Sequence, residues 1–182
     1  KVDLVALLEI AYQKSDAYNA GKETKEEAYK KSGYVDLQPV NGEVDLYDLE
    51  ALSDHNLETA IRLHISDMAI EDCCALFGGF GLRIGGEFVL YPQCCGTLSD
   101  IESWEKIIDS TSNLYLAIEG HPCPKVISYG SSVLIECADE FETFYPECNE
   151  LITVHSESLT EAIKRAVNIL RKQSQRIELC AK

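Results

Sequence analysis

The stretch FGLRIGGEFVLY, from Phe80 to Tyr91, decides the fold class because it has the pattern of a β-hairpin. Apolar side chains alternate with other residues on both sides of the pair Gly85-Gly86, beginning with Leu82 and Ile84. Such alternation is typical of strands with one buried face, and two glycines readily form a two-residue turn because glycine accepts positive φ angles. The stretch therefore predicts two antiparallel strands joined by a tight turn.

Further strand-like runs follow this hairpin. Short runs rich in Val, Ile and Leu are typical of strands when turn residues bound them, as Gly130 does here. The runs are Leu114–Ile118, Lys125–Tyr129, Ser132–Cys137 and Leu151–Val154. We expect them to form a mostly antiparallel meander.

Helical periodicity flanks and interrupts the strands. The segments predicted to be helical are Val2–Ala11, Lys22–Lys31, Asp45–Leu52, Asp67–Phe77, Ser99–Ile108 and Ser158–Leu170. The last two open on capping boxes, Ser99 with Glu102 and Ser158 with Glu161, and the apolar face of the fifth carries the single Trp, Trp104. Gly78-Gly79 is predicted to end the fourth helix, because glycine accepts the left-handed conformation that terminates helices.

These elements predict an α+β fold, in which helices cover one face of an antiparallel sheet of short strands. The expected fold has a helical N-terminus and a C-terminal helix. A chain of 182 residues has the size of one domain, so we expect a single domain, 1–182, in which residues 1–33 can form a helical appendage.

Negative charge is concentrated in the middle of the chain. The formal net charge is −15, from 16 Lys and Arg against 31 Asp and Glu. Residues 1–35 are neutral, residues 36–161 carry −20 and residues 162–182 carry +5. Because nucleic acids and anionic membranes are bound mainly through Lys and Arg, the charge disfavours both as partners. Solubility alone can account for an acidic surface, but such a surface also suits a basic protein partner.

The sequence predicts a cytoplasmic protein with reduced thiols. Asp3 and Glu9 interrupt the first apolar segment and no small-residue cleavage site follows it, so no signal peptide is expected. No run reaches the roughly 18–20 apolar residues that span a bilayer. The 8 cysteines could form disulfides, but a chain of this length does not need them for stability.

The segment between Glu136 and Glu161 lacks basic residues and interleaves aromatic side chains with carboxylates. Aromatic anchors flanked by charge are typical of tight protein interfaces. The predicted partner-binding residues are Glu136, Asp139, Glu140, Phe141, Glu142, Phe144, Tyr145 and Glu147, with Asp45, Asp48 and Glu50 as a second set. We expect a basic protein as partner, no cofactor and no catalytic residue, and the oligomeric state stays open.

Two adjacent cysteine pairs, Cys73-Cys74 and Cys94-Cys95, offer an alternative function as a metal or redox-thiol protein. The predicted hairpin lies between the pairs and would return the chain to its start, and His121 and Cys123 could add ligands. Adjacent side chains normally point to different faces, however, and the C-x-x-C spacing of structural zinc and redox sites is absent. If a metal is bound, the expected ligands are Cys73, Cys74, Cys94, Cys95 and Cys123.

A small hydrolase is the remaining alternative. Cys123 lies two residues from His121, either cysteine pair could meet His64 or His155, and paired carboxylates such as Asp139-Glu140 are present. Neither a G-x-S-x-G elbow nor a cysteine-enzyme signature accompanies these residues, so no particular reaction is indicated.

The segment YPQCCGTLSDIESW, Tyr91 to Trp104, resembles stretches of small bacterial proteins, some of which are immunity proteins of polymorphic toxin systems. The resemblance implies an acidic cytosolic α+β protein that binds and blocks a cognate toxin, often a nuclease, without catalysing a reaction. The short Trp-containing N-terminal motif of one large immunity superfamily is missing here, so no residue role is carried over.

Overall fold

The computed structural model describes residues 1–13, 16–66, 68–69, 72–109, 116–117 and 120–181, and shows an α+β fold. In this described part, two antiparallel four-stranded sheets have the orders β2-β1-β3-β4 and β5-β6-β7-β8. The first sheet contains β1 (Val2–Glu9), β2 (Leu46–Asp48), β3 (Gly78–Ile84) and β4 (Glu87–Leu90). The second contains β5 (Leu116–Ala117), β6 (Lys125–Tyr129), β7 (Ser132–Glu136) and β8 (Leu151–His155). The helices are α1 (Asp16–Asn19), α2 (Lys25–Ser32), α3 (Asp54–Ile65), α4 (Ile101–Asp109) and α5 (Ser156–Cys180).

The predicted hairpin and the later meander are confirmed. Strands β3 and β4 pair antiparallel around Gly85 and Gly86, whose φ angles are 65° and 103°. Strands β6, β7 and β8 pair in sequence order, and Gly130 forms the turn between the first two. Of the predicted run Leu114–Ile118, residues 116–117 form β5, and the others lie outside the described residues.

The helix predicted for Val2–Ala11 is wrong, because this segment forms β1, an inner strand of the first sheet. Both faces of β1 are covered. Leu4 and Leu8 belong to the main core, whereas Leu7 packs with Val44 and Leu46 on the opposite face. Apolar residues on both faces remove the alternation of a typical strand, and the remaining spacing imitates a helix.

Two other predicted helices are also wrong. Within Asp45–Leu52, residues Leu46–Asp48 form β2, which pairs with the end of β1. In the segment 67–77, residues 67, 70 and 71 lie outside the described residues, and residues 73–76 are not helical. Gly78 begins β3 instead of ending a helix. The helix of this region lies earlier, at α3, where the side chain of Ser53 accepts a hydrogen bond from the backbone N–H of Asn56.

The helices predicted at Lys22–Lys31, Ser99–Ile108 and Ser158–Leu170 are present as α2, α4 and α5, with different N-terminal caps for the last two. A short 3₁₀ turn, Leu98–Asp100, precedes α4, and its capping box uses Thr97 and Asp100 instead of Ser99 and Glu102. Helix α5 begins at Ser156, before the predicted capping box. Trp104 of α4 is fully buried, as its place on the apolar face predicts.

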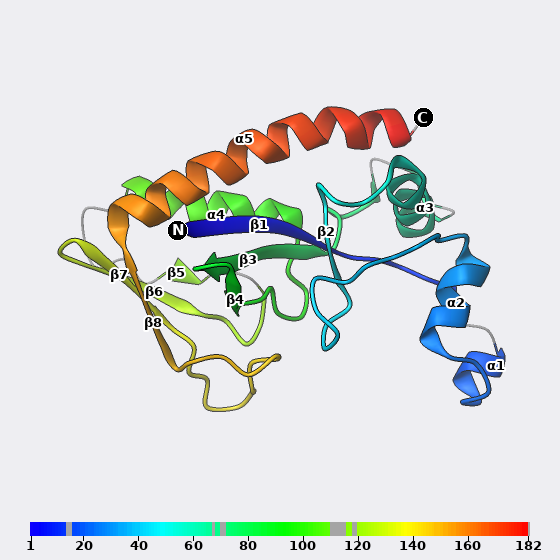
Figure 1. Ribbon diagram of the computed structural model, residues 1–182, viewed down its shortest axis with the longest axis horizontal. Helices are drawn as coiled ribbons and strands as arrows, with labels where there is room; N and C mark the ends of the chain where they lie inside the picture. The colour runs from blue at the N-terminus through cyan, green and yellow to red at the C-terminus, as the bar shows by residue number, and fades with distance from the viewer. Residues whose placement is uncertain (14–15, 67, 70–71, 110–115, 118–119, 182) are drawn as a thin grey trace.

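Helix α5 connects the two sheets by running along the upper side of the molecule above β1, next to α4 (Figure 1). Its buried residues Leu159 and Ile163 belong to one continuous core with Phe80 of the first sheet and Ile135 of the second. The two sheets and this helix therefore share one core. None of the described helices is long and apolar enough to cross a membrane.

Candidate functional site

The acidic loop, residues 137–150 between β7 and β8, has a defined conformation at the lower edge of the molecule (Figure 1). The carboxylate of Asp139 accepts hydrogen bonds from the backbone N–H groups of Phe141, at 2.8 Å, and Glu142, at 3.0 Å. These two bonds stabilise the charged form and hold the pKa of Asp139 below its usual value. Asp139 therefore stays ionised and shapes the turn that presents its neighbours.

The loop presents two of its three predicted aromatic anchors. The side chain of Phe141 is 92% exposed and that of Tyr145 is 66% exposed, whereas Phe144 is 6% exposed and belongs to the main core. The prediction that Phe144 is a partner-binding residue is therefore corrected, since its ring is used to attach the loop to the core. Glu140, Glu142 and Glu147 are exposed, and Glu136 is half-buried at the end of β7.

Gln93, which was not predicted to be functional, fixes the backbone of Tyr145. Its side-chain amide donates a hydrogen bond to the Tyr145 carbonyl at 3.1 Å and accepts one from the Tyr145 N–H at 3.0 Å. Gln93 is 9% exposed, so these bonds are shielded from water. A single glutamine in a loop carries no local signal of such a role, because its partner lies 52 residues away.

The second predicted acidic set is divided between two places. Asp45 lies near the acidic loop and forms an ion pair with Lys25 of α2. Asp48 and Glu50 line a different cavity, in which Arg83 and Arg165 provide positive charge. Only Asp45 of this set therefore belongs to the same face as Tyr145.

A cavity of about 360 Å³ lies between the acidic loop and the first sheet. Three carboxylates line it, from Glu9, Glu43 and Asp45, together with Cys94, His121, Tyr145 and the backbone around them. Among its charged lining residues the negative ones predominate, which favours an entering cation.

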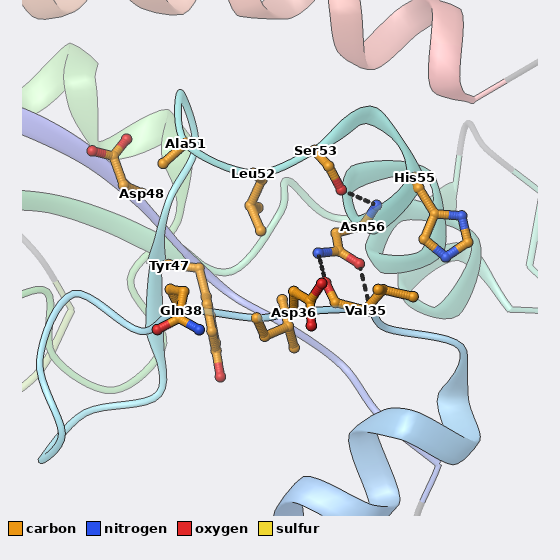
Figure 2. A pocket seen from close by; sticks show the side chains of 11 residues that line it. Val35, Asp36, Gln38, Tyr47, Asp48, Ala51, Leu52, Ser53, His55 and Asn56 are labelled. Carbon is orange, nitrogen blue, oxygen red and sulfur yellow. Dashed lines mark hydrogen bonds between the residues drawn. The ribbon is translucent and has the colours of Figure 1, made fainter.

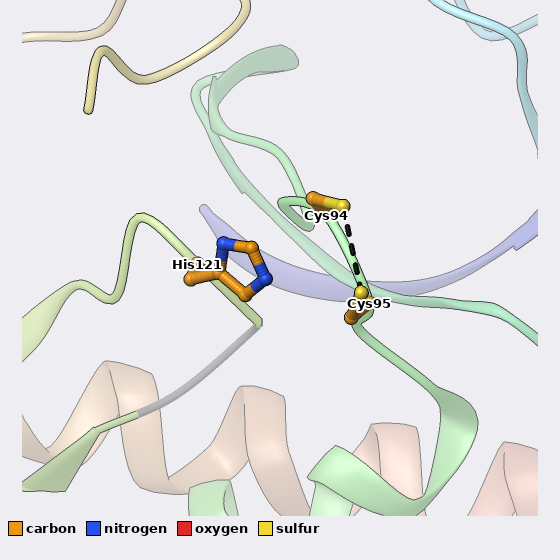
Figure 3. Close-up of side chains that lie close together, drawn as sticks. All are labelled: Cys94, Cys95 and His121. Carbon is orange, nitrogen blue, oxygen red and sulfur yellow. Dashed lines mark hydrogen bonds between the residues drawn. The ribbon is translucent and has the colours of Figure 1, made fainter.

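At one side of this cavity, Cys94, Cys95 and His121 form the cysteine–histidine cluster (Figure 3). The two sulfur atoms are 3.5 Å apart, and the possible ligand atoms of all three residues lie within 4.8 Å of one another. All three side chains are exposed. The hydrogen bond between the two thiols raises the pKa of Cys94, because it stabilises the protonated form.

Backbone contacts bring the cluster together from two distant segments. Cys94 and His121 form an isolated antiparallel bridge, in which the N–H of His121 donates to the Cys94 carbonyl at 3.0 Å. Gly120 permits this approach, because a Cβ at that position would lie 2.3 Å from the Cys94 carbonyl oxygen. Cys95 has a φ of +66°, and this left-handed conformation breaks the alternation of an extended chain. The two adjacent cysteines can therefore share one side, contrary to the sequence-based expectation.

The imidazole of His121 is held by a carboxylate of the acidic loop. Its Nδ1 lies 3.1 Å from Oε2 of Glu142, and its other ring nitrogen faces the cysteine pair (Figure 3). The bond to Glu142 raises the pKa of His121, with a smaller contribution from Cys95. Glu142 was predicted to bind a partner directly, but here it also positions a possible metal ligand.

The other predicted cysteine ligands are not part of this cluster within the described residues. Cys73 and Cys74 line a separate cavity of about 460 Å³ beside α5. There, Nε2 of His64 lies 2.9 Å from the Cys74 carbonyl oxygen and 3.9 Å from its sulfur. Cys123 is half-buried. The two adjacent pairs therefore do not form one four-thiolate group among the described residues. His121, which the sequence offered as an additional ligand, lies beside Cys94 and Cys95.

A further cavity, of about 470 Å³, opens between α3 and the segment before β2 (Figure 2). Two of its polar side chains, Asn56 and His55, hold neighbouring backbone in place. The Asn56 amide bonds to both the N–H and the carbonyl of Val35, at 3.0 and 2.7 Å, and Nε2 of His55 lies 2.8 Å from the Gly33 carbonyl. These contacts make this cavity a weaker candidate than the one beside His121.

Comparison of the chain with protein-family models, curated proteins and solved structures gives no match.

Proposed function

We propose that this protein is an acidic binding module that captures a basic protein through the acidic loop. The exposure of Phe141 and Tyr145 on a loop fixed by Asp139 and Gln93 is the observation that carries this proposal. A rigid aromatic anchor binds with little further loss of conformational entropy, because its backbone is already ordered.

The charge of the loop complements such an anchor. Glu140 and Glu147 are exposed on either side of the aromatic residues, and no Lys or Arg occurs between residues 136 and 161. Opposite charges accelerate association and reject partners of the wrong sign, while the aromatic contacts slow dissociation. The negative charge of the loop also repels nucleic-acid phosphates. A basic protein is therefore the partner class that this surface suits.

In its more specific form, the proposal makes the partner a basic toxin, such as a nuclease, and the present chain its cytoplasmic immunity protein. The support is the resemblance of the segment Tyr91–Trp104 to immunity proteins, together with the acidity of the loop. An acidic inhibitor of a nuclease would occupy the positive surface on which the nucleic acid is bound.

Charge reversal tests whether the negative charge of the loop contributes to binding. The measurement is the association rate with purified basic nucleases, including toxin domains. The double variant Glu140→Lys with Glu147→Lys should lower the association rate about tenfold or more at low salt, and the difference should shrink as salt is added. The control is Glu58→Lys with Glu178→Lys, an equal charge change at exposed positions on α3 and the distal part of α5, far from the loop (Figure 1). Equal effects of both pairs would overturn the loop assignment.

Removal of the exposed ring tests the anchor. Phe141→Ala should raise the dissociation rate about tenfold or more, which is the effect of an interface hot spot. Tyr129→Ala is the control, because Tyr129 is 72% exposed but lies on β6, outside the loop. If no basic nuclease binds the unmodified chain, the nuclease assignment fails. If Phe141→Ala binds like the unmodified chain, the anchor assignment fails.

A further inference from the structure

We propose that Cys94, Cys95 and His121 bind one zinc ion through two thiolates and one imidazole, with Glu142 orienting the imidazole and a water molecule at the fourth position. This inference is independent of the proposed protein-binding function. It rests on the position of the side chains, on the backbone that holds them and on the charge of the adjacent cavity.

The spacing of the possible ligands fits a tetrahedral zinc ion. Two sulfurs bound to one zinc at about 2.3 Å lie about 3.8 Å apart in tetrahedral geometry. The observed distance between the sulfurs of Cys94 and Cys95 is 3.5 Å, and the His121 ligand atom lies within 4.8 Å of both. Small side-chain movements are therefore enough to close the site around an ion, with both thiol protons released to solvent.

The backbone fixes this arrangement before any ion binds. The bridge between Cys94 and His121 joins the two ligand-bearing segments, and Gly120 allows the close approach. A ligand set that is already assembled loses less conformational entropy on binding than one carried by flexible segments. The cluster therefore differs from cysteines that merely happen to be exposed.

Glu142 supplies the outer support that is common at zinc sites. A histidine that binds zinc usually donates its other ring N–H to a carboxylate, which fixes the tautomer and the ring orientation. The 3.1 Å contact between Glu142 and Nδ1 of His121 is of this kind, and it leaves Nε2 free to face the sulfurs.

The chemistry of the site favours zinc over magnesium or calcium. Two thiolates and an imidazole are soft or borderline ligands, whereas magnesium and calcium prefer oxygen ligands. The neighbouring carboxylates of Glu9 and Glu43 make the approach to the cluster attractive for a cation, whereas Asp45 is already paired with Lys25. With three protein ligands and an adjacent cavity, the fourth coordination position is open to water or to a small ligand.

Cobalt binding under reducing conditions tests the site. The freshly reduced, chelator-treated chain should bind one Co²⁺ with the absorption bands of tetrahedral cobalt and of cobalt–thiolate charge transfer, and Zn²⁺ should abolish these bands by displacement. Cys94→Ser with Cys95→Ser should remove the bands. Cys73→Ser with Cys74→Ser, the other adjacent pair, should leave them unchanged. Circular dichroism checks that both variants fold, as substitution at exposed or half-buried thiols should allow.

Glu142→Gln separates orientation from coordination. It should weaken Co²⁺ binding about 10- to 100-fold and leave the band positions unchanged, because the ligands stay the same. The proposal is overturned if the reduced chain with all 8 thiols titratable binds no Co²⁺. It is also overturned if the Cys73 and Cys74 variant, instead of the Cys94 and Cys95 variant, loses the bands. Nuclease binding measured in chelator reports on the protein-binding proposal separately.

Discussion

The hydroxyl of Tyr145 donates a 2.9 Å hydrogen bond to the backbone carbonyl of Glu43, which lies 102 residues earlier in the chain. This bond joins the acidic loop to the segment that precedes β2. It brings the loop to the same cavity as Asp45, so two acidic segments that are far apart in sequence contribute to one face.

Removing this hydroxyl should loosen the connection without altering the core. Tyr145→Phe is expected to lower the free energy of unfolding by about 0.5 to 1 kcal/mol, the net value of one partly exposed hydrogen bond. Urea unfolding measures this change. Tyr129→Phe, at a residue that is 72% exposed, serves as the control and should change the free energy of unfolding less. Equal effects would show that the Tyr145 bond contributes nothing specific.

Truncation of the two phenylalanines of the acidic loop should change the stability of the protein by very different amounts. Phe144→Ala removes a ring that is 6% exposed and should lower the free energy of unfolding by about 3 to 5 kcal/mol. Phe141→Ala removes a ring that is 92% exposed and should change it by less than about 0.5 kcal/mol. Urea unfolding of both variants distinguishes them, and a strongly destabilised Phe141→Ala variant would contradict the described loop conformation.

The close approach at Gly120 predicts a larger effect of an added methyl group there than at another glycine with positive φ. Gly120→Ala should lower the free energy of unfolding by about 2 to 4 kcal/mol, because backbone strain and an overlap with the Cys94 carbonyl oxygen act together. Gly130→Ala introduces backbone strain without steric overlap, since nothing lies within 4 Å of its added Cβ. It should lower the free energy of unfolding by about 1 kcal/mol. Thermal or urea unfolding compares the two variants. Similar losses of stability would contradict the close approach of Gly120 to the Cys94 carbonyl.

A cluster of tyrosine rings predicts a loss of stability at alkaline pH. Tyr12 and Tyr34 pack against Tyr29, with ring centroids 4.9 and 5.8 Å apart from it. Burial raises the pKa of Tyr12 to about 12 and raises the pKa values of Tyr29 and Tyr34 further above their usual value of 10.0. A phenol with a raised folded-state pKa binds its proton more tightly in the folded than in the unfolded chain.

The stabilisation from these phenols is therefore complete below pH 10 and decreases as the pH rises towards 12 and beyond. Urea unfolding between pH 9 and pH 12, read beside tyrosinate absorbance, should show the decline. Tyr29→Phe should make the decline shallower, whereas Tyr129→Phe should not, because Tyr129 lies on the surface. A free energy of unfolding that stays constant across this range would contradict the burial of the cluster.

The sequence predicts those strands and helices whose pattern shows a single buried face. The hairpin around Gly85-Gly86, strands β6 to β8 and helices α4 and α5 have such patterns. The segment Val2–Glu9 does not, because its residues are buried on alternating faces against two different clusters. Its actual environment depends on β2, β3 and α5, which no local pattern contains.

The candidate site could be predicted only as a set of residue types. Cys94, Cys95 and His121 are recognisable as possible ligands, but the sequence gives no reason to prefer them over Cys73 and Cys74. What selects them is the bridge between Cys94 and His121 and the positive φ of Cys95, and both are tertiary properties. The glycine before His121 is a weak local sign of the close contact.

The position of α5 above β1 has a consequence for how the protein is made. The ribosome synthesises β1 long before α5, yet the apolar residues Leu4 and Leu8 of β1 join the same core as Leu159 and Ile163 of the helix. Arg165 of α5 also donates a hydrogen bond to the Val2 carbonyl at 2.6 Å. The first strand therefore lacks this cover until α5 has been translated, so nascent chains that stall before α5 expose an aggregation-prone sheet.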